Sequence, residues 1–261
     1  MHRPWPDVHR VVAGDVAVDI APEGLRHLTV RGREVAANLY AAVRARDWGT
    51  LPTVPVSAQL DSGRSSITLR RVETVGECLR SVLEVSWAEP GILTATVSLT
   101  VLADAEINRW GFNVCLHAGD WAGAQVLGPG QPRLPRDVAP QRAEGGVLKG
   151  LFPPLPRLDL RRPDGAVVRI VSDGQLLEAE DQRNWTDPTF KIYSGSLGDP
   201  LPLAVRSGGH GPSTANRPIA VSRSASQAWQ RASPANGKAR TSSGRAHRVS
   251  TRRAAVSGSR R

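Results

Sequence analysis

The densest group of polar side chains in the sequence lies between residues 178 and 187, and their types suit the binding of a polyol. The members that could carry chemistry are Glu180, Asp181, Arg183, Asn184, Trp185 and Asp187. Carboxylate and amide groups exchange hydrogen bonds with hydroxyl groups, and an indole ring covers the apolar face of a sugar. If residues 177–181 are extended, Glu178 and Glu180 share one face and Asp181 lies on the other. A solvated, highly charged turn has the same composition, so both interpretations stay open.

Two residues elsewhere in the chain are further candidates for ligand binding. His117 ends the predicted strand that begins near Ile107, where an imidazole can be a general base, a metal ligand or the cap of a turn. Trp48 follows the charged pair Arg46 and Asp47 and offers a second indole, which could equally pack on the core. A single histidine is more often structural than catalytic, and nothing in the spacing identifies a metal.

Several common kinds of site have no support in the sequence. It contains no G-x-S-x-G elbow, no glycine-rich phosphate loop and no H-E-x-x-H motif, so serine-triad, nucleotide and zincin chemistry lack their usual evidence and no cofactor is expected. Cys78 and Cys115 lack C-x-x-C spacing, which predicts two reduced, buried thiols. The polar N-terminus, and the absence of any run near the ~18 apolar residues of a membrane helix, predict a cytoplasmic protein without a membrane partner.

The elements that must position these residues are predicted to be β-strands. Residues 16–20 alternate in polarity, which is the period of a half-buried strand. Residues 79–87 and 92–101 flank the turn at residues 89–91 with β-branched side chains, which predicts a hairpin, and residues 107–116 add another strand. From Val35 to Val43 the apolar residues also recur every four positions, as on a helix, but a strand is favoured.

Many short strands without a long helix predict an all-β fold, either a β-sandwich or a barrel. Of these we predict a supersandwich-like β-sandwich from Val16 to Val205. Prolines cluster between Ala122 and Pro156. Because proline lacks the amide donor of a sheet ladder, this segment is predicted to be an extended excursion over the surface. The strand pattern resumes at residues 166–171.

The basic character of the chain belongs to its last segment. The formal net charge is +10, yet residues 1–206 carry 23 Lys and Arg against 24 Asp and Glu, whereas residues 207–261 carry 11 basic residues and no acid. That segment is rich in Ser, Arg, Ala, Gly and Pro, and so few apolar residues cannot offset the entropy of ordering. We therefore predict a domain at 1–206 and a disordered tail at 207–261. With little aromatic interleaving, the tail is expected to bind nucleic acid only weakly and without specificity.

Three segments of the sequence are distinctive in their order and spacing: Leu39–Thr50, with Arg46-Asp47-Trp48-Gly49; Asn108–His117; and Glu180–Asp187. Together they resemble the N-terminal region of the D-apionate lactonase family. The last is the most specific, because eight consecutive residues of such mixed character seldom recur by chance. The resemblance covers roughly Leu25 to Arg206.

Membership of this family implies hydrolysis of a sugar lactone, D-apionolactone, to the open acid in bacterial apiose breakdown. Lactone opening needs an activated water and stabilisation of an oxyanion. On this interpretation Glu180 or Asp181 is the base and Arg183 or Asn184 the oxyanion donor. Substrate contacts are expected from His117, Trp185, Asp187 and Trp48. The alternative is a non-catalytic carbohydrate-binding β-sandwich, and on either interpretation the partner is a small carbohydrate or sugar lactone.

The resemblance also implies a longer protein, because family members carry a barrel-like domain after the β domain. The resemblance disappears near Gly208, where the sequence changes abruptly to the acid-free composition. A frameshift in a GC-rich gene favours those residue types, so a truncated or frameshifted chain, inactive as a fragment, is one expectation.

Overall fold

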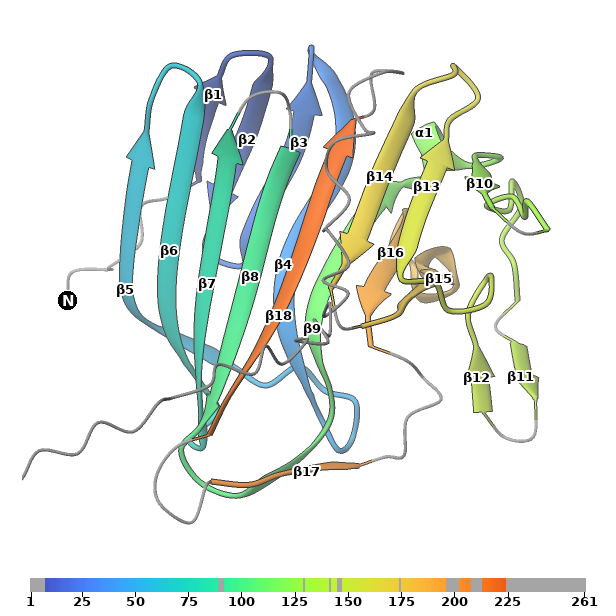
Figure 1. Ribbon diagram of the computed structural model, residues 1–261. Helices are drawn as coiled ribbons and strands as arrows, with labels where there is room; N and C mark the ends of the chain where they lie inside the picture. The colour runs from blue at the N-terminus through green and yellow to red at the C-terminus, as the bar shows by residue number, and fades with distance from the viewer. Residues whose placement is uncertain are drawn as a thin grey trace, which may run out of the picture.

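The computed structural model describes residues 8–88, 92–128, 130–140, 142–144, 147–173, 175–195, 202–207 and 213–223. Within these ranges the chain forms two eight-stranded antiparallel sheets that pack face to face, and a separate two-stranded hairpin (Figure 1). The prediction of an all-β sandwich is confirmed.

The first sheet, called sheet A, has the strand order β1-β2-β3-β4-β9-β16-β15, and β17 pairs with β9 beside it. Its strands are β1 (His9–Ala13), β2 (Val16–Ala21), β3 (Gly24–Val30), β4 (Arg33–Ala45), β9 (Ala105–His117), β15 (Leu177–Asp181), β16 (Thr189–Ser194) and β17 (Leu203–Val205). The segment from Val35 to Val43, whose pattern fitted both a helix and a strand, lies in the strand β4. Its backbone pairs with β3 on one side and with β9 on the other.

The second sheet, called sheet B, has the strand order β10-β13-β14-β18-β8-β7-β6-β5. Its strands are β5 (Thr53–Ser62), β6 (Ser66–Val75), β7 (Leu79–Ala88), β8 (Ile92–Val101), β10 (Gln125–Leu127), β13 (Arg157–Arg161), β14 (Val167–Ser172) and β18 (Ser213–Arg223). The predicted hairpin is β7 and β8, with Leu79 opposite Val101 and Ala88 opposite Ile92, while its turn lies outside the described residues. The separate hairpin is β11 (Arg142–Glu144) and β12 (Val147–Lys149).

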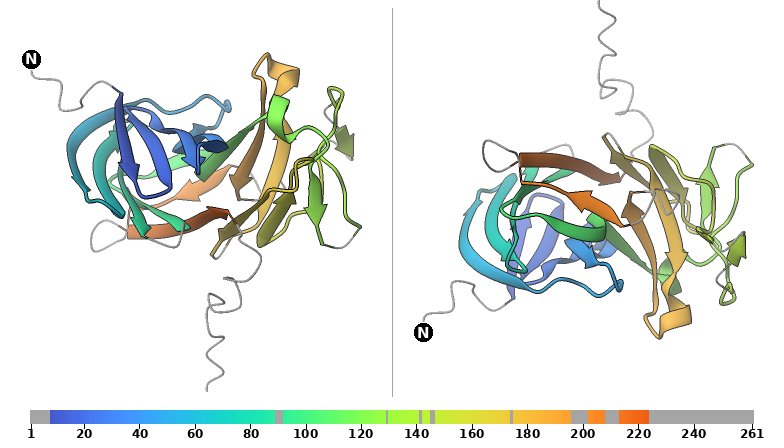
Figure 2. Two further views of the ribbon diagram at one scale, coloured as in Figure 1. Left: turned by 90° about the horizontal axis from the view of Figure 1, so that it is seen from above. Right: turned by 90° about the horizontal axis from the view of Figure 1, so that it is seen from below.

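The core lies between the two sheets, which Figure 2 shows as two layers seen along their strands. Alternate residues of β8 and β9, such as Leu99 and Phe112, point inward and are almost completely buried. This is the alternation expected of strands with one buried face.

The prediction of a disordered tail from Ser207 is wrong for residues 213–223. They form β18, which lies between β14 and β8 and pairs with both. A strand inserted between two others has backbone partners on both edges, and Ile219 and Val221 on its inner face are buried. Low apolar content therefore did not prevent this segment from joining an existing sheet. Residues 208–212 and 224–261 lie outside the described residues.

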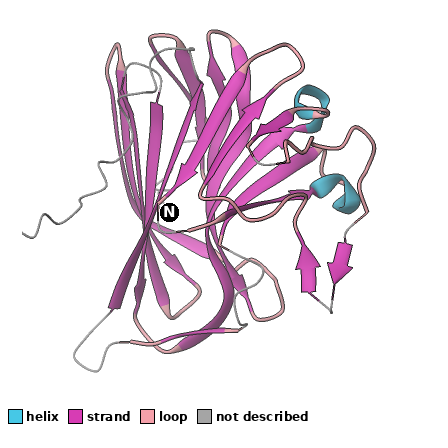
Figure 3. Ribbon diagram, turned by 45° about the vertical axis from the view of Figure 1, so that its right-hand side comes forward, coloured by secondary structure: helices cyan, strands magenta, loops and turns pink. Residues whose placement is uncertain are grey.

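The proline-rich excursion is only partly a surface segment. It includes the short strands β10 to β12, and Leu134 within it is 1% exposed. Two short helical turns, α1 (Ala118–Trp121) and η1 (Gln182–Trp185), follow β9 and β15, and Figure 3 shows both on the same side of the molecule.

Both cysteines are free thiols, as predicted, although Cys78 is only partly buried. Among the described residues, no helix has the length and apolar character needed to cross a membrane.

Candidate functional site

Four neighbouring strands of sheet A carry apolar side chains on one face and mainly polar ones on the other. In the order β4, β9, β16, β15, two adjacent rows of the register are Asn38, Cys115, Lys191 and Glu180, and Tyr40, Asn113, Tyr193 and Glu178. Residues opposite each other in antiparallel strands share a face. The residues between these rows, including Leu39, Val114 and Ile192, belong to the core. The rows therefore lie on the face of sheet A that points away from the core, which we call the polar face.

A cavity of about 400 Å³ opens on the polar face. Its most distinctive lining residues are Arg44, Trp48, Arg109, Glu180, Trp185 and Lys191. This volume lies within the range of about 300–1,000 Å³ that is usual for small-molecule sites. Three of the residues predicted from the sequence, Trp48, Glu180 and Trp185, thus meet in one cavity, which we call the pocket.

Two exposed indoles flank the pocket. Trp48 is 43% exposed and lies in the turn after β4, where Asp47 accepts a hydrogen bond from the backbone amide of Gly49. Trp185 is 64% exposed and ends η1. An indole with one wet edge is suited to cover the apolar face of a sugar, and two of them beside one cavity offer apolar surface for the same ring.

The charged residues of the pocket differ in how far they are already paired. Glu180 lies 2.9 Å from Lys191 and accepts a hydrogen bond from Gln182 at 3.0 Å. The Arg109 guanidinium lies over the ring of Tyr193, 4.1 Å from its centre, and 5.6 Å from the centre of the Trp48 ring. Among the described residues, the Nη2 atom of Arg109 is buried and has no hydrogen-bond partner.

Burial raises the pKa of three other groups on the polar face, Tyr193, Tyr40 and Cys115. Burial, reinforced by the charges of Glu180 and Glu178, raises the pKa of Tyr193, whose hydroxyl donates to Glu178 at 2.9 Å. Burial raises the pKa of Tyr40 to about 12 and that of the Cys115 thiol to about 11. A thiolate is the reactive form of cysteine, so Cys115 is not a nucleophile near neutral pH.

Glycine is required at position 111 on the pocket floor. Gly111 has a φ of 142°, and a Cβ atom there would clash with the Oγ of Ser194. That hydroxyl accepts a hydrogen bond from the backbone amide of Phe112 at 3.0 Å, which ties β9 to the end of β16. The close approach of the two strands therefore depends on the missing side chain.

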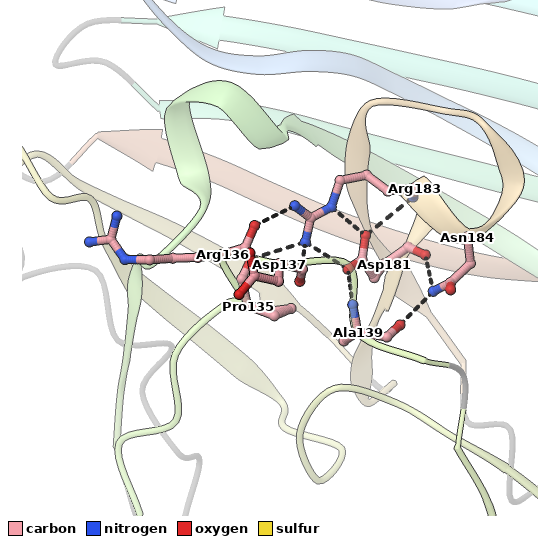
Figure 4. Close-up of polar contacts among 7 residues, drawn as sticks. All are labelled: Pro135, Arg136, Asp137, Ala139, Asp181, Arg183 and Asn184. Carbon is pink, nitrogen blue, oxygen red and sulfur yellow. Dashed lines mark hydrogen bonds and ion pairs between the residues drawn. The ribbon is translucent and has the colours of Figure 1, made fainter.

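Asp181 and Arg183 lie outside the pocket lining and form a structural brace (Figure 4). Arg183 donates to both carboxylate oxygens of Asp181, at 2.8 and 2.7 Å, and to the backbone carbonyls of Pro135, Arg136 and Asp137. The Asp181 side chain is only 1% exposed. Its pKa lies below the usual value: burial raises it, but hydrogen bonds from Arg183 and from the backbone amide of Ala139 outweigh that effect.

The brace positions the segment that carries Trp185. Asp181 caps η1 by accepting a hydrogen bond from the Arg183 backbone amide at 3.2 Å. Asn184 donates to the backbone carbonyls of Ala139 and Asp181, at 2.6 and 3.0 Å. Asp181, Arg183 and Asn184 therefore lie outside the pocket and hold the local fold together, which favours the scaffold interpretation for these three predicted catalytic residues. Glu180, the fourth, lines the pocket, although it is paired with Lys191 and Gln182 there.

The two remaining predicted residues do not line the pocket. The Nδ1 atom of His117 accepts a hydrogen bond from the backbone amide of Gly119 at 3.2 Å, so His117 caps α1. Asp187 is exposed and acts on the polar face through its charge, raising the pKa of Cys115. No group of three or more His, Cys, Asp or Glu side chains in the described ranges is arranged to hold a metal ion.

Three cations of the pocket were not predicted from the sequence: Arg44, Arg109 and Lys191. Their signal is the alternation of residues along β4, β9 and β16, which places them on the face opposite the core residues. The register between strands distant in the sequence was needed to show that they face one cavity.

The chain is similar in sequence to a known protein family and to a curated protein. Residues 1–214 match the family model described as D-apionate lactonase, N-terminal domain. The chain is also similar to D-apionate lactonase of Brucella anthropi, with 28% identity over 215 residues. That alignment covers 74% of this chain and 32% of the relative, so the matched region spans about a third of the relative's length.

Proposed function

The chain belongs to the D-apionate lactonase family through its N-terminal domain, and from this premise we propose that it is the N-terminal part of a sugar-lactone hydrolase. The proposed reaction is the hydrolysis of D-apionolactone to D-apionate in bacterial sugar catabolism. The relative from Brucella anthropi is named for this activity. Because the alignment covers only 32% of that relative, the activity is proposed for the longer protein to which this domain would belong.

The observation that carries the proposal is the convergence of Trp48, Trp185 and Glu180 on one cavity. Two indoles supply apolar surface for a sugar ring, and the carboxylate supplies a hydrogen-bond acceptor. Asn113 and Gln182, which also line the cavity, add amide groups for hydroxyls.

The pocket offers a base and an oxyanion donor for lactone opening. Glu180 accepts a proton from water as the water oxygen bonds to the lactone carbonyl carbon, and Arg109 donates hydrogen bonds to the resulting oxyanion. The bond from that carbon to the ring oxygen then breaks, and the proton passes from Glu180 to the departing oxygen. In this scheme Arg109 replaces Arg183 and Asn184, whose donors are engaged in the brace.

A non-catalytic carbohydrate-binding domain is the second candidate. The observation that favours it is the engagement of Glu180 by both Lys191 and Gln182, since a carboxylate that already accepts two hydrogen-bonding partners is less available to water. In this case the pocket binds the sugar, and chemistry takes place elsewhere in a longer enzyme.

One experiment separates the two candidates. The purified chain is mixed with D-apionolactone, ring opening is followed by NMR, and binding is measured by calorimetry with apiose, the corresponding sugar. The test variant is Glu180→Gln, and the matched control is Glu84→Gln, because Glu84 pairs with Arg70 on the outer face of sheet B.

Turnover that is lost in Glu180→Gln and retained in Glu84→Gln supports the hydrolase with Glu180 as its base. Binding without turnover supports the carbohydrate-binding domain. A folded sample that neither binds nor hydrolyses contradicts both.

A further inference from the structure

We propose that the pocket is selective for an anion: it binds the open-chain hydroxy acid, through its carboxylate, more tightly than the neutral lactone or sugar. Arg109 is the residue that anchors the carboxylate. This inference rests on the proposed function, because it concerns the same pocket, and it adds the chemical class and charge of the preferred ligand.

The side chains that line the pocket are mainly positively charged where they carry a charge. Arg44, Arg109 and Lys191 face the pocket, whereas Glu180 is its only lining carboxylate among the described residues. Glu180 lies 2.9 Å from Lys191, so these two charges offset each other. The residues that line the pocket therefore carry an excess of positive charge, which attracts an anion.

Arg109 has a hydrogen-bond donor that lacks a partner within the ranges that the structure describes. Arg44 already donates to the hydroxyl of Thr50, whereas the buried Nη2 of Arg109 has no partner in the part of the chain that the structure describes. A buried donor without a partner is unfavourable. Because Nη2 is enclosed, a small movement of the Arg109 side chain brings it to a ligand in the pocket, where a carboxylate accepts short, charge-assisted hydrogen bonds from it. The unsatisfied donor of Arg109 thus points to a hydrogen-bond acceptor that a ligand supplies.

Two aromatic rings hold the guanidinium of Arg109 in place. The guanidinium lies over the Tyr193 ring, 4.1 Å from the ring centre, and 5.6 Å from the centre of the Trp48 ring, so the two rings restrict its position before a ligand arrives. A planar guanidinium restricted in this way matches the two oxygens of a carboxylate, and little side-chain entropy is lost on binding. The aromatic ring of Trp48 beside it then covers the carbon chain of the same ligand.

A hydroxy acid fits this arrangement better than a bare anion. The carboxylate lies on Arg109, while the amides of Asn113 and Gln182 are available for hydroxyl groups in the same cavity. Because D-apionate is such an acid, the inference predicts that the product of lactone opening remains bound and inhibits further turnover.

The test compares ligands that differ in charge. Calorimetry on the full chain measures binding of D-apionate, of apiose, which is neutral and cannot hydrolyse to an acid, and of acetate and inorganic phosphate as simple anions. The same titrations are repeated with Arg109→Gln, Arg109→Lys and the control Arg70→Gln, whose guanidinium lies on sheet B. Circular dichroism confirms that each variant is folded.

We expect D-apionate to bind at least about tenfold more tightly than apiose, and both simple anions to bind more weakly than D-apionate. Arg109→Gln should weaken D-apionate binding by at least about tenfold more than it weakens apiose binding and so remove this preference, Arg109→Lys should keep part of it, and Arg70→Gln should change neither affinity. If Arg109→Gln does not fold, the ratio of D-apionate to apiose affinity is compared between wild type and Arg109→Lys. A smaller ratio in Arg109→Lys supports the role of Arg109, and an equal ratio contradicts it.

The outcomes distinguish this inference from the proposed function. Apiose binding that equals or exceeds D-apionate binding overturns the inference and leaves the sugar site standing. Phosphate binding tighter than that of D-apionate also overturns it, in favour of a phosphorylated ligand. A folded chain that binds none of the sugars or acids overturns the proposed function itself.

Discussion

Arg183 donates hydrogen bonds to both carboxylate oxygens of Asp181, its neighbour two positions earlier in the chain. The remaining donors of the same guanidinium reach the backbone carbonyls of Pro135, Arg136 and Asp137. Asp181 and Arg183 are thus joined to each other and to a loop distant in the sequence, beside the pocket that they were predicted to serve.

Substitution of Arg183 should therefore reduce stability. Arg183→Met leaves the carboxylate of Asp181 buried without its main partner, and we expect a loss of about 3 kcal/mol in the free energy of unfolding. Urea denaturation measures this. Arg46→Met is the control, because the pair of Arg46 with Glu106 is exposed and its loss should cost less than about 1 kcal/mol. A variant of normal stability with impaired ligand binding would show instead that Arg183 acts in the site.

The same pair predicts a pH dependence. Hydrogen bonds hold the pKa of Asp181 below its usual value despite burial, so its contribution to stability is present above the unfolded pKa of about 3.9 and is lost as the pH falls through the folded pKa. Asp181→Asn lacks this contribution. The stability difference between wild type and Asp181→Asn should therefore be larger at about pH 6 than at about pH 3 in urea titrations. A difference that stays constant or grows in acid contradicts the assignment.

Removal of an exposed indole should affect binding but not folding. Trp185 is 64% exposed, so Trp185→Ala should change the free energy of unfolding by less than about 0.5 kcal/mol. Loss of its contact with a sugar should weaken the binding of apiose by about tenfold, which calorimetry can measure. Leu102→Ala, at an exposed apolar residue outside the pocket lining, should leave the affinity unchanged. Equal affinities for wild type and Trp185→Ala would remove Trp185 from the site.

A methyl group at position 111 should destabilise the floor of the pocket. Gly111→Ala combines a positive φ of 142° with a clash against Ser194, and we expect a loss of about 2–3 kcal/mol. Gly128→Ala is a matched control, because Gly128 has a φ of 151° but no atom within 4 Å of the added Cβ. Thermal denaturation should show a clearly larger fall in Tm for Gly111→Ala, and equal falls would mean that the backbone angle alone matters.

The sequence by itself determined the class of fold and much of its local structure. In β7 and β8, side chains alternate between core and solvent, a property of each strand that needs no knowledge of its neighbours. It also singled out Trp48, Glu180 and Trp185, because an indole or carboxylate in a polar segment keeps its chemical capacity in any fold.

Only the tertiary structure decided which of these groups act together. The register of β4, β9, β16 and β15 is a long-range property, and it alone brings Arg109 and Lys191 to the pocket with Glu180. The same long-range pairing gave residues 213–223 a place between two strands, although their composition favoured disorder. Alternation along β15 already places Asp181 on the face opposite Glu180, but the carbonyls that accept from Arg183 come from a loop far away in the sequence, and only the tertiary structure brings that loop to the guanidinium.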